Sequence, residues 1–256
     1  MLLAVAVVAA VAGCSTTAQR TSHLPLSLPL PIAVGTRRAS VEQWQHWATQ
    51  HIHSGDIIFI RGESHILLGL VNFSQLCMQL TDSPFSHVAA AAWENGELVV
   101  YDIIRDGARR TPWGEFVGDR LVHTIAVKRL RPEYQRHIPE ALAYCRQVYE
   151  SGVPFDAGFK LGNDRLYCSE LVEIAFRRAG VALSSPMRVD ELPGYVALGW
   201  PTKQLLEVAT PLRSTQEVLV PGNATIGIWA SPCLEPVLDE TETTAPPGAV
   251  PTIARR

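Results

Sequence analysis

The stretch Leu166-Tyr167-Cys168-Ser169-Glu170-Leu171-Val172 constrains the fold of this chain more than any other. Starting at Cys168, apolar residues recur at the spacing of an amphipathic helix, which Gly180 ends: Cys168, Leu171, Val172, Ala175, Phe176 and Ala179. Cys168 is therefore expected in the first helical turn, on the stripe that faces the protein. The partial positive charge at a helix N-terminus favours the thiolate, the reactive form of cysteine. Two interpretations follow: Cys168 is a small buried hydrophobic residue, or it is a nucleophile.

The overall composition is that of a globular protein with a packed core. Of the 256 residues, 47% are hydrophobic and 18% are charged. The net charge of −3 and the lack of a Lys/Arg run give no indication of nucleic-acid binding. The five cysteines are dispersed and form neither a zinc-binding pattern nor a disulfide framework.

The N-terminus resembles the signal of a bacterial lipoprotein. Residues 1–13 form an apolar run that is too short to span a bilayer and is typical of a signal-peptide h-region. The run leads into Val11-Ala12-Gly13-Cys14-Ser15, which resembles a lipobox, although no Lys or Arg precedes it. The alternative is a buried N-terminal helix. We expect a signal peptide and lipobox in residues 1–14, a lipid on Cys14, and attachment to the outer membrane of a bacterial cell, facing the periplasm.

Composition divides the rest of the chain into three parts. Residues 15–39 are rich in Ser, Thr, Pro and Leu, as in an extended tether. Residues 232–256 are rich in Pro, Thr and Glu, which predicts a disordered tail. The folded domain is therefore expected over residues 40–231, and Ser40-Val41-Glu42-Gln43 resembles a capping box that opens its first helix.

A β-hairpin is predicted around Asn95-Gly96, because this pair lies between two apolar runs. If it is a two-residue turn, Glu94 pairs with Glu97. His87 and Asp102 then lie on the same face as diagonal neighbours, roughly 7–8 Å apart at the backbone. A slip of one residue would place them on opposite faces, so this inference depends on the turn type.

Periodicity also predicts the neighbouring elements. Strands are expected at residues 55–60 and 121–129, and helices at residues 63–80 and 132–149. Cys77 and Cys145 lie on the apolar stripes of these two helices and are predicted to be core residues.

The predicted elements bring together the residue types of a thiol hydrolase. A cysteine nucleophile needs a base, and the base needs a third polar group that fixes its tautomer and orientation. His87 and Asp102 are candidates for these two roles. On spacing alone this signal is weak, and two alternatives stay open: His87 as an ordinary strand histidine, and Asp102 as the residue that ends a strand. Glu170 is interpreted as structural, and His123 and Asp156 are the next candidates for the third group.

Four motifs resemble the permuted NlpC/p60 papain-like family, especially its YiiX/YebB-like branch, and more distantly lecithin retinol acyltransferase. They lie within residues 50–200, in the family's order: Gly55-Asp56-Ile57-Ile58-Phe59, Ser83-Pro84-Phe85-Ser86-His87-Val88, Val100-Tyr101-Asp102 and Tyr167-Cys168-Ser169-Glu170-Leu171-Val172. The resemblance implies an α+β fold, a circularly permuted papain-like hydrolase domain whose antiparallel sheet packs on the Cys-bearing helix. It also implies that Cys168 is the nucleophile, His87 the base and Asp102 the third residue, where members often carry Glu. The backbone N–H of Cys168, next to Tyr167, is expected to stabilise an oxyanion.

The resemblance implies a cysteine peptidase or amidase that needs no metal or cofactor. For a lipid-anchored envelope protein, the nearest amide-rich substrate is the stem peptide of peptidoglycan. One alternative is a thiol acyltransferase or hydrolase of lipid esters or amides, with the apolar segment 66–80 lining an acyl groove. A second alternative is a non-catalytic envelope-binding module, which labelling with iodoacetamide at neutral pH would distinguish, because a poised Cys168 reacts faster than a free thiol.

Overall fold

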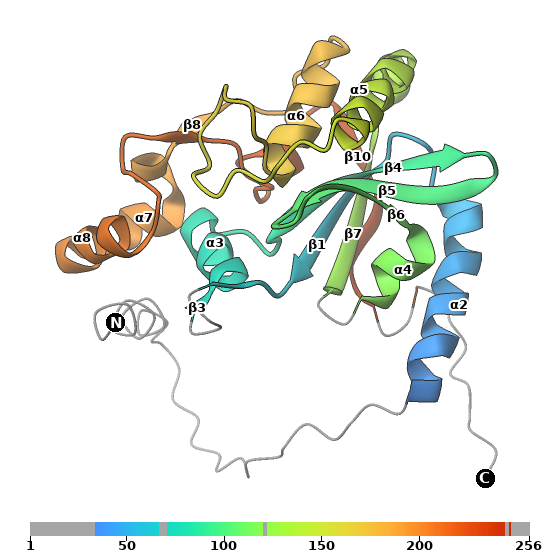
Figure 1. Ribbon diagram of the computed structural model, residues 1–256, viewed down its shortest axis with the longest axis horizontal. Coiled ribbons are helices and arrows are strands. Elements are labelled where there is room, and N and C mark those ends of the chain that lie inside the picture. Colours follow the sequence, from blue (N-terminus) through green and yellow to red (C-terminus); the bar gives the residue numbers. More distant parts are fainter. Residues whose placement is uncertain (1–33, 67–70, 120–121, 244–245, 247–256) are drawn as a thin grey trace.

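The computed structural model describes residues 34–66, 71–119, 122–243 and 246 (Figure 1). An antiparallel sheet with helices on both faces forms its centre, which agrees with the predicted α+β class. In the described ranges, no helix has the length and apolar character needed to cross a membrane. The predicted signal peptide over residues 1–14, with the lipidation site Cys14, lies outside the described residues.

The central sheet has six strands, and every neighbouring pair is antiparallel. Its spatial order is β10 (Leu234–Glu242), β7 (Val122–Leu130), β1 (Ile57–Gly62), β4 (His87–Glu94), β5 (Glu97–Ile104) and β6 (Gly107–Pro112). Strands β4 and β5 form the predicted hairpin, in which Glu94 pairs with Glu97. Asn95 and Gly96 both have positive φ, 51° and 83°, as a two-residue type I′ turn requires. The predicted register is therefore confirmed.

Strand β4 is buried on both faces because helices cover both sides of the sheet. Side chains alternate along a strand, so Val88 and Ala90 face one core whereas Ala89 and Ala91 face the other. The resulting run of small apolar residues lets elements on both faces pack close to the strand.

Helices α5 (Ile138–Glu150) and α6 (Cys168–Arg178) cover one face of the sheet (Figure 1). The helix predicted over residues 132–149 is divided, because a 3-10 helix, η1 (Pro132–His137), precedes α5. Cys145 is buried on the inner side of α5, as predicted. These helices and the sheet enclose the larger hydrophobic core.

Helices α2 (Val34–His51) and α4 (Trp113–Gly118) cover the opposite face (Figure 1). Helix α2 begins before the predicted capping box at Ser40 and occupies the end of the predicted tether, residues 15–39. Ser40 does not cap this helix. Its hydroxyl instead donates a hydrogen bond to the carbonyl oxygen of Thr243, 2.8 Å away.

The prediction of a disordered tail over residues 232–256 is wrong for its first part. Strand β10 extends from Leu234 to Glu242 and pairs with β7 at the edge of the sheet. The polar composition of this segment gave no strand signal. Its apolar side chains Leu234 and Leu238 are nevertheless buried. Pro236 is tolerated because the strand is at the edge and its register shifts after this residue.

The single helix predicted over residues 63–80 is also wrong. The structure has two short strands, β2 (His65–Ile66) and β3 (Val71–Asn72), followed by α3 (Phe73–Thr81). The side chain of Asn72 accepts a hydrogen bond from the backbone N–H of Gln75 and caps α3. The helix therefore starts after this cap, whereas apolar periodicity alone predicted a start at residue 63.

Helix α3 belongs to a third, smaller hydrophobic cluster. It packs against α7 (Pro193–Ala197), and α8 (Trp200–Ala209) contributes the buried Leu206. The remaining short elements are β8 (Met187–Arg188), η2 (Val189–Glu191), β9 (Glu217–Val218) and η3 (Ile228–Ala230).

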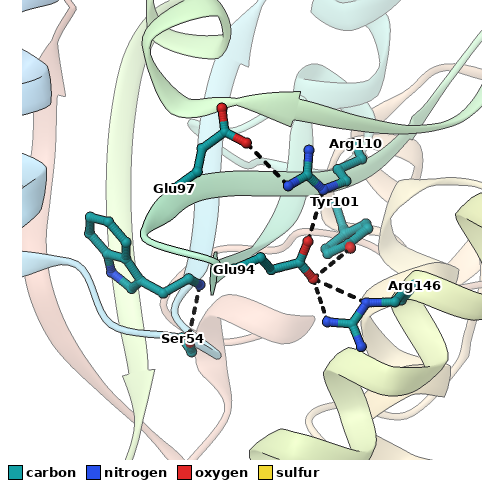
Figure 2. Close-up of polar contacts among 7 residues, drawn as sticks. Ser54, Glu94, Glu97, Tyr101, Arg110 and Arg146 are labelled. Atoms are coloured by element: carbon teal, nitrogen blue, oxygen red, sulfur yellow. Dashed lines mark hydrogen bonds and ion pairs between the residues drawn. The ribbon is translucent and has the colours of Figure 1, made fainter.

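Glu94, at the turn end of β4, ties the hairpin to α5 (Figure 2). Its carboxylate accepts hydrogen bonds from the Tyr101 hydroxyl at 2.8 Å and the Arg110 Nε at 2.9 Å. Arg146, on α5, donates to the same carboxylate. This cluster lies at the opposite end of the hairpin from His87 and fixes the sheet against the helix layer.

Candidate active site

Cys168 is the first residue of α6, as its spacing predicted. The preceding residue, Tyr167, is the N-cap in an extended conformation, and its side chain makes no capping hydrogen bond. The sulfur therefore lies at the positive end of the helix dipole. The predicted apolar stripe of this helix, including Leu171 and Phe176, is buried against the sheet.

His87 and Asp102 meet across the β4–β5 hairpin. His87 is the first residue of β4, and its Nε2 donates a hydrogen bond to Oδ2 of Asp102 at 2.8 Å. The side chain of Asp102 is fully buried, whereas that of His87 is slightly exposed. The hairpin register that paired Glu94 with Glu97 thus brings the two predicted residues together.

The imidazole of His87 and the thiol of Cys168 influence each other's protonation. Burial raises the pKa of Cys168, but the charge of His87, its hydrogen bond and the backbone N–H of Val88 outweigh this and lower the pKa. Burial lowers the pKa of His87, but the charge of Cys168 and the hydrogen bonds to Asp102 and Cys168 raise it overall. These opposite shifts favour a thiolate–imidazolium pair.

The other thiols with shifted pKa behave differently. Burial raises the pKa of Cys145 to about 12, as expected for a core residue. Burial, followed by the charge of Cys168, raises the pKa of Cys77 to about 12. Cys77 is only partly buried, so the prediction that it is a core residue is not confirmed. Only Cys168 among these three is poised as a nucleophile.

Asp102 has a second partner that sequence reasoning missed. Arg109 lies directly opposite it on β6, and its Nε and Nη2 donate to Oδ1 and Oδ2 of Asp102 at 2.7 and 2.9 Å. Burial raises the pKa of Asp102, but the hydrogen bonds from His87 and Arg109 outweigh it and lower the pKa. The Asp106-Gly107 pair was the available sequence signal, since it marks a second hairpin that leads into β6.

The two reserve candidates for the third polar role lie in other interactions. Asp156 accepts hydrogen bonds from the backbone N–H groups of Gly158 and Lys160 at 2.8 and 2.7 Å, and so shapes the loop before α6. His123 lies 3.4 Å from a Glu63 carboxylate oxygen, and both side chains are exposed. Neither takes the place of Asp102 beside His87.

Tyr167 is held by its side chain rather than directed at the thiol. Its buried hydroxyl accepts a hydrogen bond from the backbone N–H of Leu219 at 2.7 Å. Its ring packs edge-on against Phe159, which has an unusual positive φ of 53°. These contacts fix the backbone that precedes the Cys168 N–H, the group predicted to stabilise an oxyanion.

Glu170 is buried two residues after Cys168. Its Oε1 accepts a hydrogen bond from the backbone N–H of Gly162 at 3.3 Å, whereas Oε2 has no hydrogen-bond partner among the described residues. Burial, with a smaller contribution from the charge of Asp156, raises the pKa of Glu170 to about 7. These contacts support the structural interpretation of Glu170.

Comparisons with known proteins agree with this geometry. Residues 51–192, more than half of the 256-residue chain, match the family described as "Permuted papain-like amidase enzyme, YaeF/YiiX, C92 family". The chain is also similar to a solved structure titled "Crystal structure of metalloprotein yiiX from Escherichia coli O157:H7, DUF1105", with a TM-score of 0.54 and 21% sequence identity. That match covers 74% of this chain and 98% of the other, and together with the family match it confirms the permuted papain-like fold. No curated protein matches this chain.

Proposed function

Because this chain belongs to the permuted papain-like amidase family YaeF/YiiX, C92, we propose that it is a cysteine hydrolase that cleaves amide bonds by a Cys-His-Asp mechanism. The observation that carries this proposal is the convergence of Cys168, His87 and Asp102 from three separate elements. A thiol of lowered pKa, an imidazole beside it and a buried carboxylate behind the imidazole are the parts that nucleophilic acyl transfer requires.

The first half-reaction forms an acyl-enzyme. The Cys168 sulfur attacks the carbonyl carbon, a C–S bond forms, and the carbonyl electrons move onto the oxygen. The oxyanion is stabilised by the backbone N–H of Cys168 at the start of α6. His87 then transfers its proton to the leaving nitrogen, the C–N bond breaks, and a thioester remains on Cys168.

The second half-reaction regenerates the enzyme. His87 takes a proton from water as the water oxygen attacks the thioester carbonyl. The C–S bond breaks, the carboxylic acid leaves, and the thiolate–imidazolium pair forms again. Throughout, Asp102 holds the Nε2–H of His87, which leaves Nδ1 as the ring nitrogen that exchanges the proton.

A metal ion does not fit this site, although the related YiiX is titled a metalloprotein. Both oxygens of Asp102 are hydrogen-bonded to Arg109, and Oδ2 also accepts from His87. Across the described ranges, no group of three or more His, Cys, Asp or Glu side chains is arranged to hold a metal. No step of the proposed mechanism uses a metal ion.

The substrate that we propose is the stem peptide of peptidoglycan. The support is the amidase family together with the lipobox-like sequence that ends at Cys14, which predicts a lipid-anchored protein of the bacterial envelope. A lipid anchor on the periplasmic side of the outer membrane would hold the hydrolase next to an amide-rich polymer. Replacing Cys14 by Ser should release the protein from the membrane fraction, and a variant that stays there with unaltered mass would contradict the anchor.

The second candidate substrate is a lipid ester or amide. Helix α3 supports it through its apolar side chains, and the charge of Cys168 contributes to the raised pKa of Cys77 on this helix. Apolar side chains of α3, among them Phe73 and Leu76, belong to the third hydrophobic cluster. Of these, Phe73 is only partly buried, so it is the side chain that an acyl chain extended from Cys168 along α3 would contact.

One experiment separates these candidates. The full-length chain is incubated with purified muropeptides and, separately, with phospholipid vesicles, and the products are identified by mass spectrometry. Muropeptides shortened at an amide bond support the peptide substrate, and released fatty acids support the lipid substrate. Cys168→Ala is the control. If the wild-type chain forms neither product and its Cys168 reacts with iodoacetamide no faster than Cys77, the chain is a non-catalytic binding module.

A further inference from the structure

Asp102 lies between two cationic groups on adjacent strands. His87 on β4 donates to its Oδ2, and Arg109 on β6 donates to both of its oxygens. Asp102 and Arg109 are direct cross-strand partners, so the sheet itself sets their separation. The three side chains therefore form a line across one face of the sheet, with the carboxylate in the middle.

The carboxylate is shared unequally between these partners. Arg109 binds it in a bidentate arrangement, whereas His87 makes a single hydrogen bond to it. A bidentate guanidinium is a strong and geometrically fixed partner for a carboxylate. The guanidinium carries a positive charge next to the carboxylate. It therefore partly cancels the negative potential that Asp102 produces at the imidazole ring.

We propose that Arg109 is a positioning residue of the active site. It orients Asp102 and offsets the charge of this carboxylate, and His87 therefore loses its proton at a lower pH than it would without Arg109. This inference rests on the proposed thiol hydrolase. It adds a fourth residue to the Cys-His-Asp line, acting on His87 through Asp102. A cysteine hydrolase needs an imidazolium that can give up its proton to the leaving group, and an uncompensated buried carboxylate would hold that proton more tightly.

The surroundings of each group determine the sign of the expected effect. Besides Asp102, Arg109 experiences the charges of Glu115 on α4 and of Asp119, which follows that helix. These groups line a surface cavity of about 360 Å³ together with Arg109. Cys168 and Asp102 are the charged and titratable groups with the largest effects on the pKa of His87, and Asp102 is in direct contact with the ring.

Removing the guanidinium leaves the negative charge of Asp102 beside His87 without compensation. The imidazolium then becomes more stable relative to the neutral ring, and the pKa of His87 rises. Removing the charge of Asp102 has the opposite effect and lowers this pKa. Arg109 and Asp102 are therefore expected to shift the titration of His87 in opposite directions.

The test is an NMR titration of the imidazole carbons in the full-length chain carrying Cys168→Ala. This background removes the thiolate, so the titration does not depend on hydrolysis. We expect Arg109→Gln to raise the pKa of His87 by about one pH unit and Asp102→Asn to lower it. Arg109→Lys retains the positive charge, and we expect it to keep the pKa within about 0.3 unit of the Cys168→Ala parent.

Arg110 provides the matched control. It lies next to Arg109 on β6, its side chain is 26% exposed against 30% for Arg109, and it pairs with Glu94 on the other face. Arg110→Gln should leave the titration of His87 unchanged, and thermal melts identify the variants that are folded. If Arg109→Gln shifts the pKa no more than Arg110→Gln does, or lowers it, the inference is wrong. Should Arg109→Gln fail to fold, an Arg109→Lys variant whose His87 pKa rises by a full unit would overturn it as well.

The experiments distinguish a failure of the proposed hydrolase activity from a failure of the proposed role of Arg109. If the wild-type chain hydrolyses no amide or ester while Arg109→Gln raises the His87 pKa, the charge relationship holds without the enzyme activity. If hydrolysis is observed and the pKa does not move, the activity holds and the role of Arg109 does not.

Discussion

The Nε2 of His87 lies 2.8 Å from Oδ2 of Asp102, a contact that crosses the β4–β5 hairpin on the diagonal. The two-residue turn at Asn95-Gly96 sets this contact, because a shift of one residue in the pairing would move one side chain to the opposite face. The chemistry of the site thus depends on the backbone of a turn at the far end of the hairpin.

Replacing Asp102 by Asn tests the orientation of His87. The amide can donate as well as accept, so it permits the imidazole tautomer with the wrong nitrogen protonated, and we expect kcat to fall by about 10⁴. Asp102→Glu should retain at least about tenfold more activity than Asp102→Asn, because it keeps a carboxylate beside His87 and Arg109. Turnover is measured beside a thermal melt for both variants. Near wild-type turnover in Asp102→Asn would remove Asp102 from the site.

Cys168 and His87 should behave as one catalytic unit. Cys168→Ala or His87→Ala alone should abolish activity, and the double variant should cost little more than either single change. Cys77→Ser is the matched control, since its thiol has a raised pKa, and we expect it to change kcat/KM less than about threefold. Losses that add independently across the two single variants would show that His87 is not the base for Cys168.

The hairpin and the Cys168 helix were predictable because each has a strong local signal. Asn95-Gly96 has few alternatives to a tight turn, and both residues take positive φ. The stripe from Cys168 to Phe176 follows the helical period, and its members are buried or partly buried. These two signals made Cys168, His87 and Asp102 candidates, and the resemblance to the permuted papain-like family then assigned their roles.

The elements that were not predicted depend on tertiary contacts. Strand β6 has the sequence Gly-Ala-Arg-Arg-Thr-Pro, which lacks apolar alternation, so Arg109 was missed. Strand β10 is polar apart from a few anchors, and it forms because the edge of β7 offers unpaired backbone groups. The early start of α2 likewise has no capping signal at Val34, and the packing of Trp44 against Trp113 stabilises the helix from the side.

Glu94→Gln should destabilise the fold without removing activity. Burial raises the pKa of Glu94, but hydrogen bonds from Arg146, Arg110 and Tyr101 lower it to about 2. Since this is below the unfolded value, the stabilisation is present at neutral pH and is lost as the pH falls from about 4.5 towards 2. Both arginines are partly exposed, so solvent screening reduces the effect to about 1–2 kcal/mol at pH 7.

Urea unfolding at pH 7 and pH 3 measures this contribution. The difference in unfolding free energy between wild type and Glu94→Gln should shrink at pH 3. Glu97→Gln is the control, because Glu97 is half exposed and its ion pair with Arg110 is a single, longer contact of 3.2 Å. A loss as large in Glu97→Gln as in Glu94→Gln would show that the cluster at Glu94 does not clamp the hairpin to α5.

Glu170→Gln should stabilise the protein, and more so as the pH rises. The pKa of Glu170 is raised to about 7, chiefly by burial, so the folded state binds a proton that the unfolded state releases above about 4.5. Stability is therefore lost as the pH increases through this window, and the neutral amide removes the loss. We expect a gain of up to about 3 kcal/mol at pH 8 and little change at pH 5.

Urea unfolding at pH 5 and pH 8 measures the gain in unfolding free energy. Glu140→Gln is the control, because the carboxylate of Glu140 is exposed. If Glu170→Gln and wild type lose stability equally between pH 5 and pH 8, then Glu170 does not carry a proton in the folded protein.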